Sequence, residues 1–386
     1  MSITVDIHAL QTIPPSLINR DDMGAPKTAR FGGVQRQRVS SQSWKRAIRE
    51  DFAQRFPSER LGKRTRLVGD LICRRIQELA EESGQAWDAE AAVAGVKSLF
   101  SAAKIKLVDP KNSAADDDEQ KVDEQKVQYP EIGYLYFMSS HQIDAAARAI
   151  LDKNGESFSK KEATGILDSE HSIDMALFGR MVADDAAHNV DASVQVAHAL
   201  GIHESEPEFD YYTAVDDVVV DRKETGAGMI GTTQMMSSTL YRFATVDVDS
   251  LAENLAASEE VVEVVAAFVD SFITSLPSGK QNSFAHNTLP ELVYVTVSDQ
   301  RSVSLVSAFE EPVVATAKDG RRLTGARALA TEAADIQHTY GIAPHAQFVL
   351  AIGELAEPFA EFAQVVTLPQ LGERIAQAIR ELQSEA

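Results

Sequence analysis

Residues 19–50 read NRDDMGAPKTARFGGVQRQRVSSQSWKRAIRE, and no other stretch of the chain is as informative about its fold. The first half contains three glycines and one proline, which forbid a long helix, so we expect an irregular loop. The hexapeptide VQRQRV at 34–39 is predicted to form a short strand. Side chains alternate along a strand, so this prediction places Arg36 and Arg38 on one face.

A helix is predicted to follow, from about Gln42 to Phe56, with Ser40 and Ser41 as capping residues. Its apolar residues recur every four positions and predict one buried face: Trp44, Ile48 and Phe52. A different face carries Gln42, Lys45 and Arg49. Free N–H groups and hydroxyls in a first helical turn, together with cations, can bind phosphate. Because none of these groups reads a base edge, the stretch predicts sequence-independent recognition of a nucleic-acid backbone.

The net charge of the whole chain argues against a nucleic-acid partner, but the distribution of charge along the sequence does not. The 386 residues include 37 Lys and Arg against 58 Asp and Glu, a formal charge of −21, which would repel a phosphodiester. Residues 1–75, however, hold 15 basic and 7 acidic residues, a net of +8, and the other 311 residues carry −29. Eight of the fifteen cations lie between Arg20 and Arg49. This asymmetry predicts a basic working surface on an acidic body.

The rest of the chain mixes strands and helices. Thr4–Leu10 predicts a first strand that Pro14 and Pro15 end. Residues 58–170 look mostly helical, and their charged tandem repeat at 116–127 is interpreted as an exposed loop or a solvated helix. Further strands are predicted at 173–181, 291–297 and 345–352, a long hairpin at 209–247, and helices at 250–276, 327–340 and 368–382. Without a regular β/α alternation, this order predicts an α+β protein with a helical insertion.

The composition excludes several classes of function. The single cysteine, Cys73, cannot form an internal disulfide, and no Cys/His spacing resembles a zinc site, which fits a reducing cytoplasm. We expect no export signal and no membrane span. The motifs of nucleotide hydrolysis and dinucleotide binding are absent from the sequence, so we expect no cofactor and no metal.

Several of these segments, taken in order, resemble one known family. They include a first strand ending near His8, LINRDDM at 17–23, and the basic strand that leads into SSQSWKRAIRE at 40–50. The similarity continues at 173–181, 190–200, 211–218 and 231–255, and is faint at 280–295. The chain resembles the CasC family, the repeated backbone subunit of the type I-E CRISPR surveillance complex, Cascade, within the wider Cas-seven superfamily. The region 58–170 departs from this pattern.

The resemblance implies an α+β fold shaped like a right hand. It implies a modified RRM-like (ferredoxin-like) palm from 1–57 and 171–386, helical fingers from 58–170, and a thumb β-hairpin from 201–231 within the palm. No RNP-type aromatic signature is visible in this sequence. Base stacking on the sheet is therefore not assumed.

The resemblance also implies a non-catalytic, cytoplasmic protein that binds CRISPR RNA. Copies would polymerise along the guide, kink it at regular intervals, and leave the segments between kinks free to pair with target DNA. The implied partners are the guide RNA, copies of the chain itself, target DNA through the guide, and the other type I-E Cascade subunits: the large subunit, the small subunit, the five-prime-end cap subunit and the guide-processing endonuclease.

Ten residues are candidate RNA contacts, and nine of them match positions at which this family contacts RNA. Those matching guide-backbone contacts are Arg20, Lys27, Ser40, Gln42, Lys45, Arg46 and Arg49. Arg180 and Met181 match a position where a methionine wedges between bases beside the kink. Without the resemblance, Met181 would be interpreted as a core residue. Thr213 falls on the expected thumb, where simple hairpin packing is an equal alternative.

Other functions stay open at this point. A metal-dependent nuclease acting on RNA would use loop aspartates such as Asp21 and Asp22, because hard divalent metals bind clustered carboxylates. An acidic scaffold without nucleic acid would account for the composition but not for residues 20–49. His198 lies among apolar residues and is predicted to be a core histidine rather than a ligand.

Overall fold

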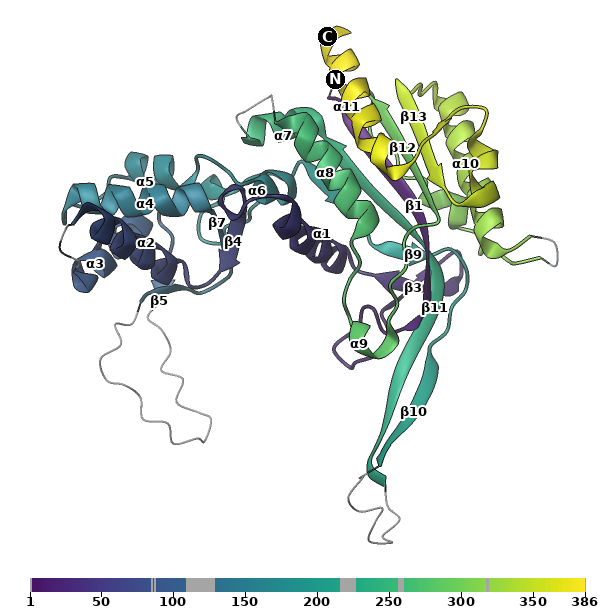
Figure 1. Ribbon diagram of the computed structural model, residues 1–386, viewed down its shortest axis with the longest axis horizontal. Coiled ribbons are helices and arrows are strands. Elements are labelled where there is room, and N and C mark those ends of the chain that lie inside the picture. The colour runs from purple at the N-terminus through teal and green to yellow at the C-terminus, as the bar shows by residue number, and fades with distance from the viewer. Residues whose placement is uncertain are drawn as a thin grey trace. The chain divides into compact units, whose positions relative to one another are not determined.

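The computed structural model describes residues 2–84, 86, 88–108, 129–215, 227–255, 260–316 and 319–385. The chain divides into two compact units (Figure 1). The sheet unit comprises Met1–Phe52, Val194–Asp249 and Glu259–Ala386, and the helical unit comprises Ala53–Ser193 and Ser250–Ser258. This division places residues 171–193 with the helices, whereas the sequence analysis assigned them to the palm.

The sheet unit is built on one large sheet, which has ten strands within the described residues. Their order is β14-β13-β12-β1-β11-β9-β3-β2, and β8 and β10 also pair with β11. The pair β13–β14 is parallel, and the others are antiparallel. The strands are β1 (Thr4–Ser16), β2 (Thr28–Phe31), β3 (Val34–Val39), β8 (Val194–Val196), β9 (Ala199–Gly201), β10 (Glu208–Val215), β11 (Ala227–Asp247), β12 (Leu292–Ser298), β13 (Ala346–Ala351) and β14 (Gln364–Val365).

Strand β1 lies at the centre of the sheet and is longer than predicted. It continues through Pro14 and Pro15, where the sequence predicted its end. Pairing with β12 stops at Leu10, and the register with β11 shifts between Ile13 and Ser16. The prolines therefore lie where the sheet needs no N–H from them, which is where strands tolerate proline.

Helices pack on both sides of this sheet (Figure 1). On one side, α10 (Arg321–Tyr340), η4 (Val306–Phe309) and η5 (Gly353–Phe359) share a buried apolar cluster with the central strands. On the other side, α1 (Ser41–Arg55) and α8 (Val261–Thr274) meet β11, and α11 (Leu368–Glu385) contacts β12 and β13. The predicted strand at 34–39, the predicted helix at 42–56 and both predicted C-terminal helices are confirmed.

The side covered by α10 carries a cluster of rings. The imidazole of His8 stacks with the rings of Tyr241, Phe243 and Tyr294 at centroid distances of 6.2, 5.0 and 5.5 Å. Burial lowers the pKa of His8 to about 3, so this ring is neutral at physiological pH. Because α10, η4 and η5 pack over this side of the sheet, these rings are not exposed for stacking on bases.

A buried arginine holds α1 against the opposite side. The guanidinium carbon of Arg242 lies 3.7 Å from the ring centroid of Trp44 and 4.3 Å from that of Phe272. Its Nη1 donates to Oε1 of Gln11 at 2.6 Å, and its Nη2 donates to the carbonyl oxygen of Phe272. Burial lowers the pKa of Arg242 to about 9. Two aromatic faces and two acceptors therefore replace part of the water that this cation has lost, and Nε has no hydrogen-bond partner among the described residues.

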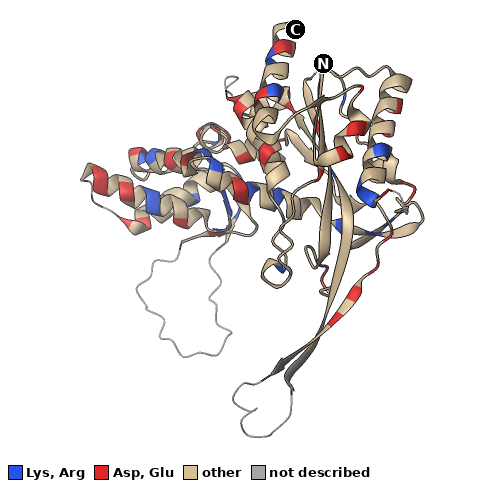
Figure 2. Cartoon of the chain, turned by 45° about the vertical axis from the view of Figure 1, so that its right-hand side comes forward, with Lys and Arg blue, Asp and Glu red and all other residues tan. Residues whose placement is uncertain are grey.

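The helical unit has its own apolar core, which includes Ile72, Phe100 and Ile143. Its helices are η1 (Ser58–Arg60), α2 (Val68–Ser83), α3 (Ala89–Ala102), α4 (Ser140–Lys153), α5 (Lys160–Leu167), α6 (Ile173–Phe178) and η2 (Ala186–His188). Two short β-pairs join β4 (Gly62–Thr65) to β7 (Tyr136–Ser139) and β5 (Leu107–Val108) to β6 (Glu131–Ile132). Cations and carboxylates are interspersed on its helices (Figure 2). The predicted helical character of 58–170 is confirmed, while the repeat at 116–127 lies outside the described residues.

Two further predictions of secondary structure are wrong. Residues 173–181 form no strand, because they contain α6, which ends at Gly179 with φ +75°. Five of the six residues of α6 are buried, Asp174 included, so the segment has no polar face from which a helical period could be recognised. The single helix predicted at 250–276 is replaced by α7 (Val248–Leu255) and α8.

No helix in the described part of the chain is both long and apolar enough to cross a bilayer.

Replacement of Trp44 by Ala is expected to lower the free energy of unfolding by about 3–5 kcal/mol, because it removes a large buried ring and uncovers the Arg242 charge. Equilibrium denaturant unfolding measures this change. The control is Gln42→Ala on the exposed side of the same helix, expected within about 0.5 kcal/mol of the parent chain. Equal losses in the two variants would show that α1 is not held through Trp44.

Candidate nucleic-acid interface

The exposed side of α1 carries four of the predicted RNA contacts. Its buried residues are Trp44, Ala47, Ile48 and Phe52. The opposite side is formed by Gln42, Lys45, Arg46 and Arg49, which we call the α1 stripe. These four residues follow the spacing i, i+3, i+4, i+7, so they project from one side of the helix. The predicted division of this helix into an apolar and a basic face is confirmed.

Lys45 and Arg49 bring two positive charges together within the stripe. Partial burial lowers the pKa of Lys45, and the charge of Arg49, one turn away, lowers it further. Two like charges at this spacing destabilise an isolated helix slightly. A bound anion would relieve this repulsion, so the stripe favours a negatively charged ligand.

The first turn of α1 has fewer free N–H groups than predicted. The N–H of Ser41 donates to Nδ1 of His198 at 3.0 Å, and that of Ser43 donates to Oγ of Ser40 at 3.4 Å. Ser40 is only 4% exposed, and its own N–H donates to Oδ1 of Asn19 at 2.9 Å. The side chain of Ser40 therefore caps the helix from inside the protein.

The prediction of a core histidine at position 198 is wrong, because His198 is exposed. Desolvation is the largest cause that lowers its pKa, and the charges of Arg38 and Lys27 lower it further. A lowered pKa favours the neutral ring, which is the form that can accept the bond from Ser41. His198 therefore acts as a cap for α1.

Arg20 and Lys27 flank a closed turn before β2. An antiparallel bridge between Arg20 and Pro26 closes it. The Asp21 carboxylate accepts from two backbone N–H groups inside the turn, at 3.0 and 2.9 Å. Asp21 therefore stabilises the turn, while Asp22 is exposed. Among the described residues, no three His, Cys, Asp or Glu side chains come close enough together to hold a metal ion.

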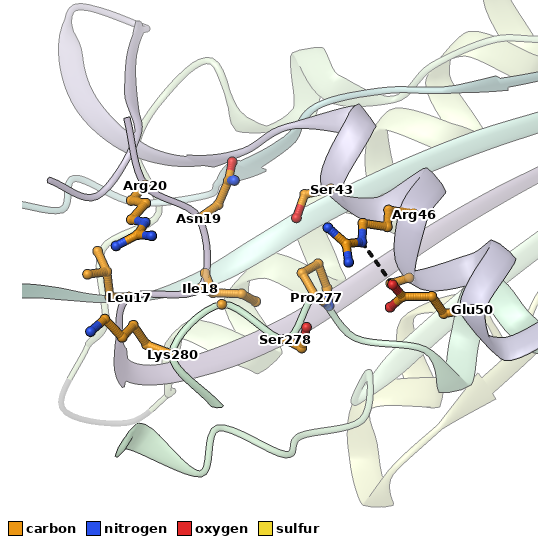
Figure 3. A pocket seen from close by; sticks show the side chains of 12 residues that line it. Leu17, Ile18, Asn19, Arg20, Ser43, Arg46, Glu50, Pro277, Ser278 and Lys280 are labelled. Carbon is orange, nitrogen blue, oxygen red and sulfur yellow. Dashed lines mark hydrogen bonds and ion pairs between the residues drawn. The ribbon is translucent and has the colours of Figure 1, made fainter. Parts of the chain in front are cut away.

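A pocket of 290 Å³ joins this turn to α1 (Figure 3). Its charged lining residues are Arg20, Arg46, Glu50 and Lys280, and the remainder is Leu17, Ile18, Asn19, Ser43, Ala47, Pro277, Ser278 and Gly279. Arg20 and Lys280 lie on one side of it, and Arg46 with Glu50 lies on the other. Oε1 of Glu50 accepts from Nε of Arg46 at 2.8 Å. Lys280 is not among the residues predicted from the sequence, because it is remote from residues 20–49 and lies in a region of only faint family similarity.

Strand β3 contributes less exposed charge than its sequence suggested. Arg36 is fully buried, and its guanidinium donates to the carbonyl oxygens of Gly201, Phe309 and Glu310 at 3.0, 3.1 and 3.1 Å. Arg38 is half-buried, and its Nε donates to a backbone carbonyl on β2 at 3.4 Å. Arg36 is thus a structural cation.

In the helical unit, Met181 is 80% exposed, whereas its neighbour Arg180 is buried. Nη2 of Arg180 donates to Oδ1 of Asp168 at 2.6 Å, and Nε donates to the carbonyl oxygen of His188 at 2.9 Å. Nη1 donates to the carbonyl oxygen of Leu167 at 3.0 Å. The guanidinium of Arg180 is therefore occupied by protein groups, and it fixes the segment from which Met181 projects. Without the family resemblance, Met181 would have been placed in the core, and its exposure contradicts that alternative.

Thr213 lies on the hairpin formed by β10 and β11, opposite Ile230. Its side chain is exposed, as are those of Phe209 and Tyr211, which alternate with it along β10. The hairpin predicted at 209–247 is confirmed, and most of its glycine-rich tip, 221–226, lies outside the described residues.

Comparison with known proteins identifies relatives along nearly the whole chain. A solved chain described as "CRISPR RNA-guided surveillance complex, pre-nicking" is 30% identical, with a TM-score of 0.76 over 97% of this chain and 100% of that one. Another, described as "CRISPR RNA-guided surveillance complex", is 27% identical, with a TM-score of 0.71 over 97% of this chain and 99% of that one. No curated protein matches the chain. The family model described as CT1975-like protein matches residues 5–374, and the chain therefore belongs to the CT1975-like protein family.

Proposed function

We propose that this protein is the CRISPR RNA-binding backbone subunit of a Cascade-type surveillance complex, of type I-E. One observation carries the proposal: the α1 stripe and the cationic pocket lie on the same unit of a chain that is similar, over 97% of its length, to chains of CRISPR RNA-guided surveillance complexes. A generic acidic scaffold would have no use for this concentration of cations.

In the proposed mechanism, the protein binds the phosphate backbone of the guide RNA. Arg20, Lys27, Gln42, Lys45 and Arg49 would contact phosphates, and none of them needs to read a base. Ser40 would act through the helix that it caps, and Arg46 belongs to both the stripe and the pocket. The bases stay free to pair with target DNA, so base pairing provides the sequence recognition.

The palm, fingers and thumb of the proposed subunit can be assigned to parts of the two units. The sheet unit would be the palm, the helical unit the fingers, and the β10–β11 hairpin with Thr213 the thumb. The antiparallel order β12-β1-β11, with α8 and α11 on one side, supports an RRM-like palm whose usual base-stacking side is covered by α10. Met181, held outward by Arg180, would wedge between bases at the kink.

The proposed assembly is a cytoplasmic ribonucleoprotein. Copies of the chain would polymerise along the guide together with the large, small and cap subunits and the guide-processing endonuclease, and would engage target DNA through the guide. The chain itself would be non-catalytic.

Expression beside a CRISPR array is expected to yield the protein in complex with a discrete small RNA. Purified protein should bind unrelated single-stranded RNAs of equal length with nearly equal affinity. The logarithm of the binding constant should fall with the logarithm of salt concentration by about 0.7 for each phosphate contacted. Filter binding at several salt concentrations measures this slope. Strong sequence preference, together with a binding constant that does not change with salt concentration, would contradict binding through the RNA backbone.

Replacement of Lys45 by Gln is expected to separate binding from stability. The variant removes a phosphate contact and one of two repelling charges, so RNA binding should weaken while the free energy of unfolding stays equal or rises by about 0.2–0.5 kcal/mol. Parallel RNA titration and denaturant unfolding test both halves. Loss of stability together with binding would indicate a structural role for Lys45 instead.

A nuclease activity is not expected. Protein loaded with guide RNA and incubated with Mg²⁺ should leave a complementary RNA intact, because Asp21 already accepts two backbone N–H groups of its own turn. Gel analysis of end-labelled RNA checks this outcome. Cleavage that disappears in Asp22→Ala would show that the protein is an enzyme.

A further inference from the structure

The loop that carries Lys280 has an unusual backbone. Lys280 and Ala285 adopt left-handed conformations, with φ of 52° and 47°, on either side of the short helix α9 (Gln281–Phe284). Residues with a β-carbon adopt this conformation at an energetic cost, and such strain persists where surrounding contacts enforce it. Strain of this kind is concentrated at functional sites.

Contacts on both sides of α9 enforce this conformation. Gly279 packs against the backbone of Ile18, just after the end of β1. A β-carbon at position 279 would lie 2.2 Å from the carbonyl oxygen of Ile18, so no other residue fits there without a shift. Nε2 of the buried His286 lies 3.1 Å from the carbonyl oxygen of Pro277, which ties the two ends of the loop together. The strained backbone therefore holds Lys280 at the rim of the cationic pocket (Figure 3).

The charges around the pocket are unbalanced. Three cations, Arg20, Arg46 and Lys280, face one carboxylate, and Glu50 already accepts a bond from Nε of Arg46. Ser43 and Ser278 add two hydroxyl groups to the lining. Converging cations repel one another unless an anion lies between them, and a tetrahedral anion accepts hydrogen bonds from several directions at once. The lining is therefore suited to a phosphate group.

Because Arg46 belongs to both the α1 stripe and the pocket, a polyanion bound along the stripe reaches the pocket without interruption. An isolated anion would gain no such continuity. This connection favours a phosphodiester of the bound RNA over a free anion or an acidic peptide.

We infer that this pocket is a phosphate clamp that holds one phosphodiester group of the RNA, and that Lys280 is a phosphate-binding residue of the clamp. The inference rests on the proposed RNA-binding function. It adds the loop 277–287 to the interface, far in sequence from the N-terminal basic segment.

Two substitutions of Lys280 test the clamp in the full-length chain. Lys280→Asn removes the charge but retains a residue that tolerates the left-handed conformation, and Lys280→Arg retains the charge. The matched control is Arg380→Gln, which removes one exposed charge from α11, outside the pocket. The probe is a single-stranded uridine homopolymer of fixed length, titrated at several salt concentrations, with the thermal midpoint of each variant measured in parallel.

Lys280→Asn is expected to reduce the salt slope by about 0.7 and to weaken binding about fivefold at about 0.1 M salt, the change for one lost phosphate contact. Lys280→Arg and Arg380→Gln should keep the parent slope, and all thermal midpoints should stay close to that of the parent. An unchanged slope in Lys280→Asn would overturn the clamp while leaving the proposed function intact. Failure of the parent chain to bind RNA would overturn both.

A double substitution tests whether Arg20 and Lys280 hold the same phosphate. Groups that share one ligand are coupled, whereas distant groups act additively. Lys280→Asn combined with Arg20→Gln should therefore weaken binding less than the product of the two single effects. The same substitution combined with Lys45→Gln should be multiplicative. Multiplicative effects in both pairs would show that the pocket is not one clamp, and this comparison remains informative if one variant alone loses stability.

Discussion

The sheet unit depends on one buried cation. Arg242 projects from β11 between the rings of Trp44 and Phe272 and donates to Gln11 and to the backbone of α8. Burying a guanidinium costs free energy unless partners replace water. Here α1, β1 and α8 provide two aromatic rings and acceptors for Nη1 and Nη2, while Nε has no hydrogen-bond partner among the described residues. The same contact that stabilises the unit therefore also sets the rotation of α1. Because Trp44 is fixed inward, the α1 stripe must face outward.

The position of each cation in the structure distinguishes those that stabilise the fold from those that are available to a ligand. Arg36 and Arg242 in the sheet unit, and Arg180 in the helical unit, are buried and donate mostly to backbone carbonyl oxygens. They stabilise loops and helices and have no donor directed outward for a ligand. Lys45, Arg46 and Lys280 are different. Lys45 lies beside Arg49, and the exposed side chains of Arg46 and Lys280 line one pocket together with Arg20, with Glu50 as the acid of that lining. A count of basic residues along the sequence cannot distinguish these two groups.

Local patterns predicted local structure well in several places. The period of Trp44, Ile48 and Phe52 predicted the buried face of α1, and the alternation at 34–39 predicted β3. Patterns failed where burial removed the contrast between faces, as in α6, where an almost completely buried run, Asp174 included, resembled a strand. They also failed where a residue acts on a distant partner. The neighbours of His198 in the sequence are apolar and suggested a core position, but its ring accepts a hydrogen bond from the backbone N–H of Ser41 in the first turn of α1.

The order of residues is enough to specify that α1 has one apolar and one basic face, because a helical period is a property of neighbouring residues. It also determined that the positive charge is concentrated near the N-terminus, which reversed the meaning of a net charge of −21. In contrast, the folded arrangement is needed to bring Lys280 next to Arg20 and Arg46 around one pocket, and to bury Arg36 and Arg180 inside the protein. These outcomes depend on strand order and on loop packing between residues far apart in the chain, and no local period encodes such contacts.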